Sequence, residues 1–464
     1  MKKIFILCAV VALTTLNACD KRLDVAPTQT IDQTTALNAS KDVEAALIGA
    51  YDALQNGTQN GINLDTYSGA FQYTSEILAA VPTEVRFGGT FANLQELYRK
   101  EITTINFTAE TMWLASYVAI NRCNNVLANI DKVTEAKRSR VEGEARFIRG
   151  AVYFEMVRYF GKQWADGNNA SNPGVPIVTT PTGAVTDANK LPRNSVAEVY
   201  AQAIDDLTKA EALVPIANSF YANKSVAAAI LARLYLQQGN FAAARDAANR
   251  VITSGRFRLV TPFAAAFNSR LNNNGANPAE YVFAVQVNDQ DGTNSMNTYF
   301  GTTIGSIPGT AGRGDIRVQP AHIALYEAGD ARSTFFIRPS ANTFTYKFLD
   351  RFGNVPVVRL SEMILTRAEA NFRLSTTVGA APLADINLIR ARVGLPALTT
   401  DRLTLAAILR ERKLELAFEG HALHDIKRTG GTVGALPFNS PKLILPVPQR
   451  ERDVNPALVQ NEGY

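Results

Sequence analysis

Apolar residues recur every three or four positions along much of the chain, a spacing typical of helices that bury one face. A first helix carries four apolar residues on one face, with Gly57 placed to end it: Val43, Leu47, Ala50 and Leu54. The same period predicts helices over residues 111–130, before Gly161, over 196–213 and in RLSEMILTRAEANFRL, PLADINLIRARVGLP and TLAAILRERKLELAFEG. The sequence therefore predicts a mainly α fold.

Residues 225–255 have the pattern of a tetratricopeptide-like helix pair. Ala228, Leu231 and Tyr235 line the first helix, and Gly239-Asn240 forms the turn before the second. Small side chains at positions 243, 244, 247 and 248 allow the two helices to approach closely. Such a pair must stack on neighbouring helices to bury its exposed face, so we expect further, less regular pairs around it.

Two regions lack this helical period. Residues 58–100 are rich in glycine, threonine and aromatic residues, and we predict that they are irregular. Residues 256–358 contain short strand-like pieces, YVFAVQV and TYKFL, between loops rich in glycine and asparagine. The last stretch, from residue 436, is too rich in proline for a long helix.

The N-terminus has the pattern of a secretory leader. Lys2-Lys3 precedes the apolar run 4–13, and the segment ends in Leu-Asn-Ala-Cys at Cys19, which resembles a bacterial lipobox. We predict a signal peptide over residues 1–18, a lipid on Cys19 and a polar tether over residues 19–40. Because no second run of 18 or more apolar residues follows, that lipid would be the only membrane attachment. The alternative is plain secretion with Cys19 as an ordinary thiol.

Composition and charge exclude several classes of protein. Hydrophobic residues make up 46% of the chain, too many for a disordered protein, and Lys+Arg exceed Asp+Glu by only 47 to 42. The basic residues form no stripe, which makes nucleic acid a poor candidate partner. After loss of the leader with Cys8 and lipidation of Cys19, Cys123 alone remains, so we expect no internal disulfide. Cys123 lies in an apolar-periodic stretch and is predicted to be a core residue.

Two of the three histidines stand close together in ELAFEGHALHDIKRTG, residues 415–430. A metal site, an acid–base site and an ordinary helix end are the alternatives for His421 and His424. The spacing is not that of HExxH, and His322 is far upstream, which favours a structural junction where Gly420 ends a helix. In this interpretation Arg412 and Glu415 pair on the solvated side, and Glu419 is a helix-surface or supporting group.

Other motifs do not indicate catalysis. NDQDGTNS, from Asn288, lacks the glycine and glutamate positions of a calcium loop, and no GxSxG, P-loop or Rossmann glycine pattern has the right context. Trp113 is predicted to lie in the core, and Trp164 to pack where a loop begins.

A ligand-binding platform needs exposed aromatic faces held by loops. The aromatic-rich segment between the first two long helices and a second pair of aromatic residues are the best candidates: Tyr67, Phe71, Phe87, Phe91, Tyr98, Tyr299 and Phe300. The alternative is that these side chains fill the core beneath long loops.

Taken together, the motifs resemble those of the SusD/RagB family of outer-membrane nutrient-binding lipoproteins, nearly from end to end. The resemblance rests on the lipobox at Cys19 and on DVEAALIGAYDAL, EARFIRGAVYFEMVRYFG with Gly174-Val175-Pro176, RLSEMILTRAEA, INLIRARVGLP, LRERKLELAFEGHALHDIKRTG and LPVPQRERDVNPALVQNEGY. The scaffold signature of the family corresponds here to Glu411, Arg412, Glu415, Phe418, Glu419, Gly420, Asp425 and Arg428.

The resemblance implies a fold and a role. Tetratricopeptide-like helix pairs would form a scaffold, packed against a loop-rich half with a few short strands; residues 41–255 and 256–464 would form its two regions as one compact unit. The protein would be non-catalytic, without cofactor or metal, and displayed on the outer membrane. It would act as the lid of a SusC-type TonB-dependent barrel and capture an oligosaccharide or a peptide. A lipid-anchored hydrolase and a helical-repeat adaptor for protein partners are the competing hypotheses.

Overall fold

The predicted helical stretches form helices with nearly the expected bounds in a computed structural model that describes residues 37–55, 57–59, 62–183, 186–268, 271 and 274–464. The predicted signal peptide and Cys19 lie outside the described residues. The long helices are α3 (Ser40–Gln55), α6 (Phe107–Ala128), α7 (Glu135–Phe160), α8 (Val196–Leu213), α9 (Lys224–Gln238), α10 (Phe241–Thr253), α14 (Leu360–Leu374), α15 (Pro382–Arg392) and α16 (Leu405–Glu415). The mainly α fold is therefore confirmed.

Local capping explains several of these bounds. The Asn106 side chain accepts hydrogen bonds from two backbone N–H groups of the first turn of α6. Ser195 and Glu198 form a capping box at the start of α8, which satisfies two backbone donors that the helix itself leaves free. Gly239, at φ +71°, ends α9 in a left-handed conformation that glycine adopts without a steric penalty.

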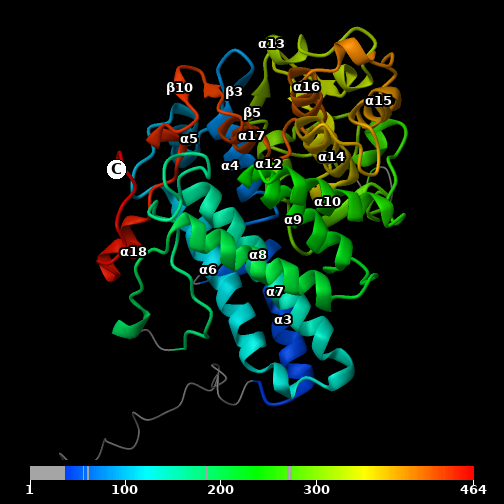
Figure 1. Ribbon diagram of the computed structural model, residues 1–464. Coiled ribbons are helices and arrows are strands. Elements are labelled where there is room, and N and C mark those ends of the chain that lie inside the picture. Colours follow the sequence, from blue (N-terminus) through cyan, green and yellow to red (C-terminus); the bar gives the residue numbers. More distant parts are fainter. Residues whose placement is uncertain (1–36, 56, 60–61, 184–185, 269–270, 272–273) are drawn as a thin grey trace, which may run out of the picture.

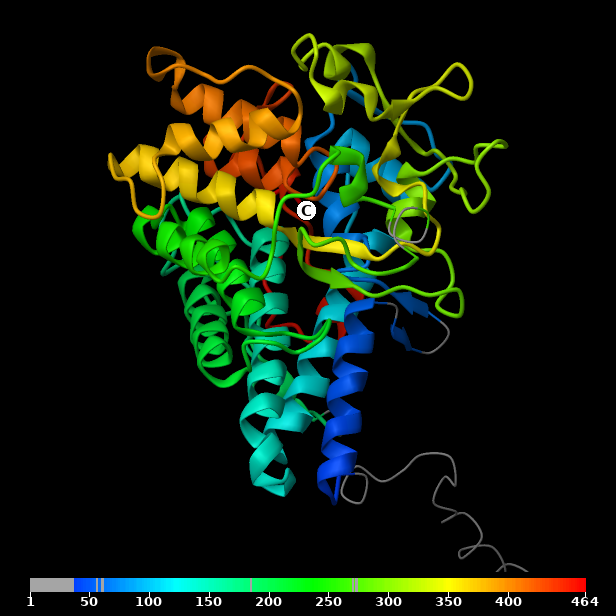
Figure 2. The same cartoon turned by 90° about the vertical axis from the view of Figure 1, so that its right-hand side faces the viewer.

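The helices stack as neighbouring pairs (Figures 1 and 2). α3, α6, α7 and α8 pack side by side, and α9 and α10 continue the array to α14, which also contacts α15 and α16. The predicted helix pair is present as α9 and α10, and Ala244, Ala247 and Ala248 are buried between α10 and its neighbours. Cys123 and Trp113 are buried in the core, as predicted.

A less regular half covers one end of this scaffold, formed by residues 57–100 and 256–358 (Figure 2). Within the described ranges its strands pair only two by two, all antiparallel. The pairs are β1 (Gly57–Gln59) with β2 (Ile62–Leu64), β3 (Val85–Phe87) with β5 (Ile316–Val318), β4 (Tyr281–Val285) with β8 (Val355–Arg359) and β6 (Phe336–Ile337) with β7 (Phe344–Thr345). A further pair, β9 (Thr432–Val433) with β10 (Leu436–Pro437), follows the C-terminal helices.

The structure corrects two predictions in this half. The segment predicted to be irregular contains two helices, α4 (Ala70–Ala79) and α5 (Ala92–Arg99). All residues of α4 from Ala70 to Leu78 are buried, including the polar side chains of Gln72, Ser75 and Glu76, so this short helix has no solvated face. The piece TYKFL is not a strand, because only its first residue lies in β7 and Tyr346–Phe348 form a short 3-10 helix, η6.

Candidate ligand-binding site

Four of the seven aromatic residues predicted to bind ligand are core side chains. Tyr67, Phe71, Phe87 and Phe300 are only 0–5% exposed. Tyr67 meets the edge of Phe71, with ring centroids 5.0 Å apart, and Phe71 stacks on Tyr159. The expectation that these four are exposed platforms is wrong, because α4, β3 and α12 (Ser295–Phe300) turn Phe71, Phe87 and Phe300 inward, and the Tyr67 hydroxyl donates to Ala151 and Glu155 of α7.

The other three predicted aromatic residues are exposed to solvent to different extents. Phe91 is 41% exposed, whereas Tyr98 is half-buried against Phe87 and Val85. Tyr299 lies at the end of α12 and meets Phe91 edge-to-face, with ring centroids 6.1 Å apart and an interplanar angle of 86°. The structure thus brings Phe91 and Tyr299 together, although they are far apart in the sequence.

Phe91 and Tyr299 line a pocket of about 370 Å³. Tyr73 of α4 adds a third ring, 4.7 Å from that of Tyr299. Phe107, at the start of α6, lies at the same pocket and is 53% exposed. Residues 73–107 and the distant helix α12 therefore build one concave aromatic surface.

Polar side chains complete the pocket wall. Asp65 accepts a hydrogen bond from Ser68 at 2.6 Å, and burial raises the pKa of Asp65 to about 6. Asn93 donates to Thr108 at 2.7 Å, and Asp291 accepts from the backbone of Asn288. The remaining polar lining residues are Gln55, Thr111, Thr293, Asn294, Ser295 and Thr298. This combination can stack against an apolar face while it hydrogen-bonds several hydroxyl groups.

Sequence reasoning missed several of these residues. The aromatic segment indicated the right region, and Tyr73 lies in it, but nothing local distinguishes Tyr73 from the buried Phe71. Phe107 carries a weak signal, since it follows the capping Asn106 and an apolar residue at the first helical position is often exposed. Asp65 and Asp291 carry no sequence signal for ligand binding, because only the folding of two distant loops brings them to the pocket.

Comparison with known proteins decides the family. A family model described as starch-binding and associating with the outer membrane matches residues 22–236, and a SusD family model matches residues 345–436. The chain belongs to the SusD/RagB family. SusD-like protein P38 of Formosa agariphila is 23% identical, and the match covers 98% of this chain and 97% of that protein.

Solved structures support the same assignment. A Bacteroides vulgatus protein whose name describes it as sugar binding is 26% identical, with a TM-score of 0.80 over 93% of this chain and 100% of that chain. Surface glycan-binding protein A from Bacteroides uniformis shares the fold, with 21% identity and a TM-score of 0.73 over 91% and 99% of the two chains. Within the described residues, no helix is both long and apolar enough to span a bilayer.

The family signature around the two histidines lies at a junction between helices, as predicted. His421 and His424 lie where α16 is followed by α17 (Ala422–Arg428), and both are buried. Burial lowers the pKa of both imidazoles well below 6.5, so they are neutral at physiological pH. Glu76 of α4 accepts hydrogen bonds from the backbone N–H groups of Gly420, His421 and Ala422 at the start of α17.

The charged residues of this signature are not on the surface, which corrects the sequence-based expectation. Arg412, Glu415 and Glu419 are all less than 10% exposed. Arg412 pairs with Asp425 at 2.8 Å rather than with Glu415. Glu415 and Glu419 instead surround Arg359 of β8, at 3.1 and 2.7 Å. The solvated face expected for α16 is covered because α14 packs against it, and Arg359 of β8 and Arg332 of the 3-10 helix η5 (Ala331–Thr334) pair with Glu415.

Proposed function

We propose that this protein binds carbohydrate in the pocket lined by Phe91, Tyr73 and Tyr299, without catalysis. The observation that carries the proposal is the corner formed by the Phe91 and Tyr299 rings above a wall of carboxyl, amide and hydroxyl groups. The names of two structural relatives, a sugar binding protein and a surface glycan-binding protein, support the same ligand class.

The chemistry of sugars fits this arrangement. A pyranose ring presents an apolar C–H face, which packs on aromatic rings, and hydroxyl groups, which need hydrogen-bond partners once they leave water. The pocket offers both kinds of contact. Its volume of about 370 Å³ is at the lower end of the range for small-molecule sites. One part of an oligosaccharide would therefore fill it, while the rest extends over the rim at Phe107.

Replacing Tyr299 or Phe91 by alanine should weaken glycan binding about tenfold or more, because an aromatic anchor at the centre of a site contributes about 1–3 kcal/mol. A glycan array would identify the best ligand, and calorimetry would give its affinity for each variant. Phe220→Ala is a matched control, because Phe220 is 46% exposed but lies outside this pocket. Thermal melts would show that the variants are folded.

The outcomes of this test are distinguishable. Loss of affinity in both pocket variants but not in Phe220→Ala supports the site. If the wild type binds peptides and no glycan, the ligand class is wrong. If a glycan binds equally to all variants, the location is wrong.

We further propose that the protein is anchored to the outer membrane by a lipid on Cys19 and caps a SusC-type TonB-dependent barrel, to which it delivers its ligand. The Leu-Asn-Ala-Cys sequence supports the anchor, and the description of the matching family model supports association with the outer membrane. The barrel partner follows from the family resemblance. A lid on such a barrel needs a large contact, of the kind that survives mild detergent.

Cells grown with radiolabelled palmitate should label the wild-type protein and not the Cys19→Ala variant. The reason is that Cys19 would carry the thioether-linked lipid at the end of the leader. Equal labelling of both proteins would contradict the anchor. From the same membranes, the tagged wild type should bring down a barrel-sized protein, and its absence would contradict the lid role alone.

A further inference from the structure

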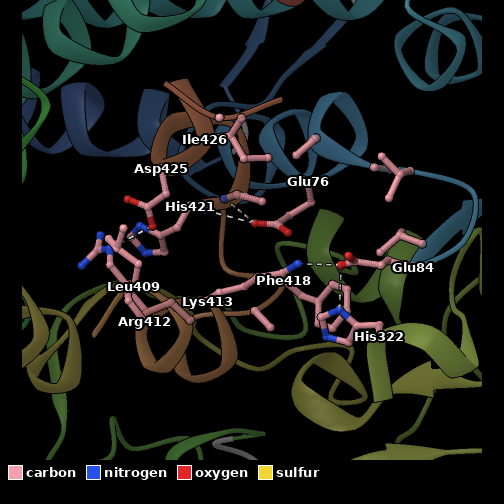
Figure 3. A pocket seen from close by; sticks show the side chains of 18 of the residues that line it. Glu76, Glu84, His322, Leu409, Arg412, Lys413, Phe418, His421, Asp425 and Ile426 are labelled. Atoms are coloured by element: carbon pink, nitrogen blue, oxygen red, sulfur yellow. Dashed lines mark hydrogen bonds and ion pairs between the residues drawn. The ribbon is translucent and has the colours of Figure 1, made fainter. Parts of the chain in front are cut away.

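A second pocket, of about 320 Å³, lies between the end of α4 and helices α16 and α17 (Figure 3). It shares no lining residue with the pocket proposed for carbohydrate. Its walls come from α4, the segment 80–85, His322 of α13 (Pro320–Ile323), α16 and α17. Three segments far apart in the sequence therefore enclose it.

The wall of this pocket is mainly apolar. Aliphatic and aromatic side chains from two of the three segments line it: Ala79, Val81, Val85, Leu409, Leu416 and Phe418. Ala422 and Ile426 of α17 add to this surface. A sugar with many hydroxyl groups would lose hydrogen bonds to water here and find few replacements. The wall favours an apolar ligand body instead.

The charged groups at the pocket neutralise one another. Lys413 pairs with Glu84 at 2.7 Å, and Arg412 pairs with Asp425 at 2.8 Å. Burial raises the pKa of Glu76 to about 7, and its carboxyl group is already occupied by backbone N–H donors of α17. Both cations are already paired, and the carboxyl groups of Glu76, Glu84 and Asp425 already have partners, so an uncharged ligand fits best.

His322 is a polar residue of this pocket whose ring nitrogens make no hydrogen bond within the described residues. Its side chain is 5% exposed, and its Nδ1 lies 3.7 Å from Glu84 Oε2, beyond hydrogen-bond distance. The ring is held by contacts with Phe418, Tyr326 and Phe336. A buried polar group without a partner is costly, so a ligand that satisfies it would be stabilised.

The protonation state of His322 sets what that ligand must carry. Burial lowers the pKa of the imidazole, so it is neutral at pH 7, with one N–H donor and one acceptor nitrogen. A hydroxyl group can accept a hydrogen bond from the N–H group or donate one to the acceptor nitrogen. A carboxylate could only accept, and it would bring an unpaired charge into an apolar wall.

We propose that this pocket binds a small uncharged molecule with an apolar ring and one hydroxyl group, and that the hydroxyl hydrogen-bonds to His322. The volume is at the lower end of the range for ligand sites, which fits a molecule of single-ring size. The site does not depend on carbohydrate binding, since it uses different residues.

The test uses two probes of the same shape, 4-ethylphenol and 4-ethyltoluene, with saturation-transfer NMR titrations on the purified protein. The wild type should bind 4-ethylphenol saturably and about 3- to 10-fold more tightly than 4-ethyltoluene, the gain expected from one hydrogen bond. His322→Phe should remove this preference while 4-ethyltoluene still binds, because the ring volume is kept and the hydrogen bond is lost.

Two variants that fill the pocket test its location. Ala79→Phe and Thr429→Trp place larger side chains at partly buried and exposed positions of the lining, so the fold should tolerate them. Both should abolish binding of both probes, with thermal melts as a check on folding. Tyr299→Ala, in the pocket proposed for carbohydrate, should leave the binding of both probes unchanged. Absence of saturable 4-ethylphenol binding, binding unaffected by both filling variants, or an unchanged preference in His322→Phe would each overturn the proposal.

Discussion

Replacement of Arg359 by methionine should lower the free energy of unfolding by about 3–5 kcal/mol, because it leaves buried carboxylates without their partner. Arg359 is 1% exposed. Its guanidinium contacts Glu419 twice at 2.7 Å, Glu415 at 3.1 Å, and Glu280. Methionine has a similar length and no charge, so the main change is electrostatic.

The pKa of Glu415 shows how the cluster depends on its cations. Burial alone would raise this pKa, but Arg392, Arg359 and Arg332 together hold it well below the usual range. Burial opposes ionisation of Glu419 in the same way, and Arg359 and Lys347 overcome it. Loss of Arg359 would therefore force these carboxyl groups to take up protons or to become hydrated by local unfolding.

Urea unfolding followed by circular dichroism would measure this effect. Arg250→Met is the matched control, since Arg250 pairs with Glu211 at 2.7 Å but is about half exposed. A solvent-screened pair of this kind contributes about 0–1 kcal/mol. If Arg359→Met and Arg250→Met lower stability equally, the buried cluster does not hold α16 against β8 as the geometry indicates.

Alanine at Gly420 should destabilise the protein by about 2–5 kcal/mol, for two reasons. Gly420 has φ +89°, a conformation that a residue with a side chain rarely adopts. A Cβ atom there would also lie 2.7 Å from the Cα of Gln72, which belongs to the backbone of α4. α4 would have to move away, and the hydrogen bond from the Gly420 N–H to Glu76 would weaken.

Gly430→Ala separates the two contributions. Gly430 has φ +72°, but no atom lies within 4 Å of the position of its Cβ. This variant should therefore lose only the backbone contribution, about 1–2 kcal/mol. Thermal or urea unfolding of both variants gives the difference, which measures the close approach of α4 to α17. Equal losses in the two variants would show that this approach does not constrain the fold.

Much of the helical scaffold follows from local sequence alone. Helix α8 begins and ends where the apolar period predicted, and the Ser195–Glu198 capping box found in the structure stabilises its start. The apolar faces of α3 and α10 were also evident, because each of these two helices has one buried and one exposed face, and the small residues of α9 and α10 indicated the pair although α9 is buried almost throughout. A few helical turns of sequence contain the whole apolar period, so it can be recognised without knowledge of neighbouring elements.

The tertiary structure decided what local patterns do not encode. α4 went unrecognised because it is short and lies in a segment rich in glycine, threonine and aromatic residues, and its polar face, Gln72, Ser75 and Glu76, is buried against distant residues. Among the aromatic residues, Tyr299 and Phe300 are adjacent, yet the first lines a pocket and the second lies in the core. Adjacent positions on a helix point in different directions, and which direction faces solvent depends on what packs there.

The charged residues show most clearly which features the sequence determines and which only the tertiary structure decides. The sequence determined that the run from Glu411 to Arg428 carries charges of both signs, which is also typical of a solvated helix face. The structure placed Arg359, more than fifty residues upstream, between Glu415 and Glu419. A buried ion pair and an exposed one have the same local sequence. Only the distant partner, which excludes water and supplies the opposite charge, distinguishes them.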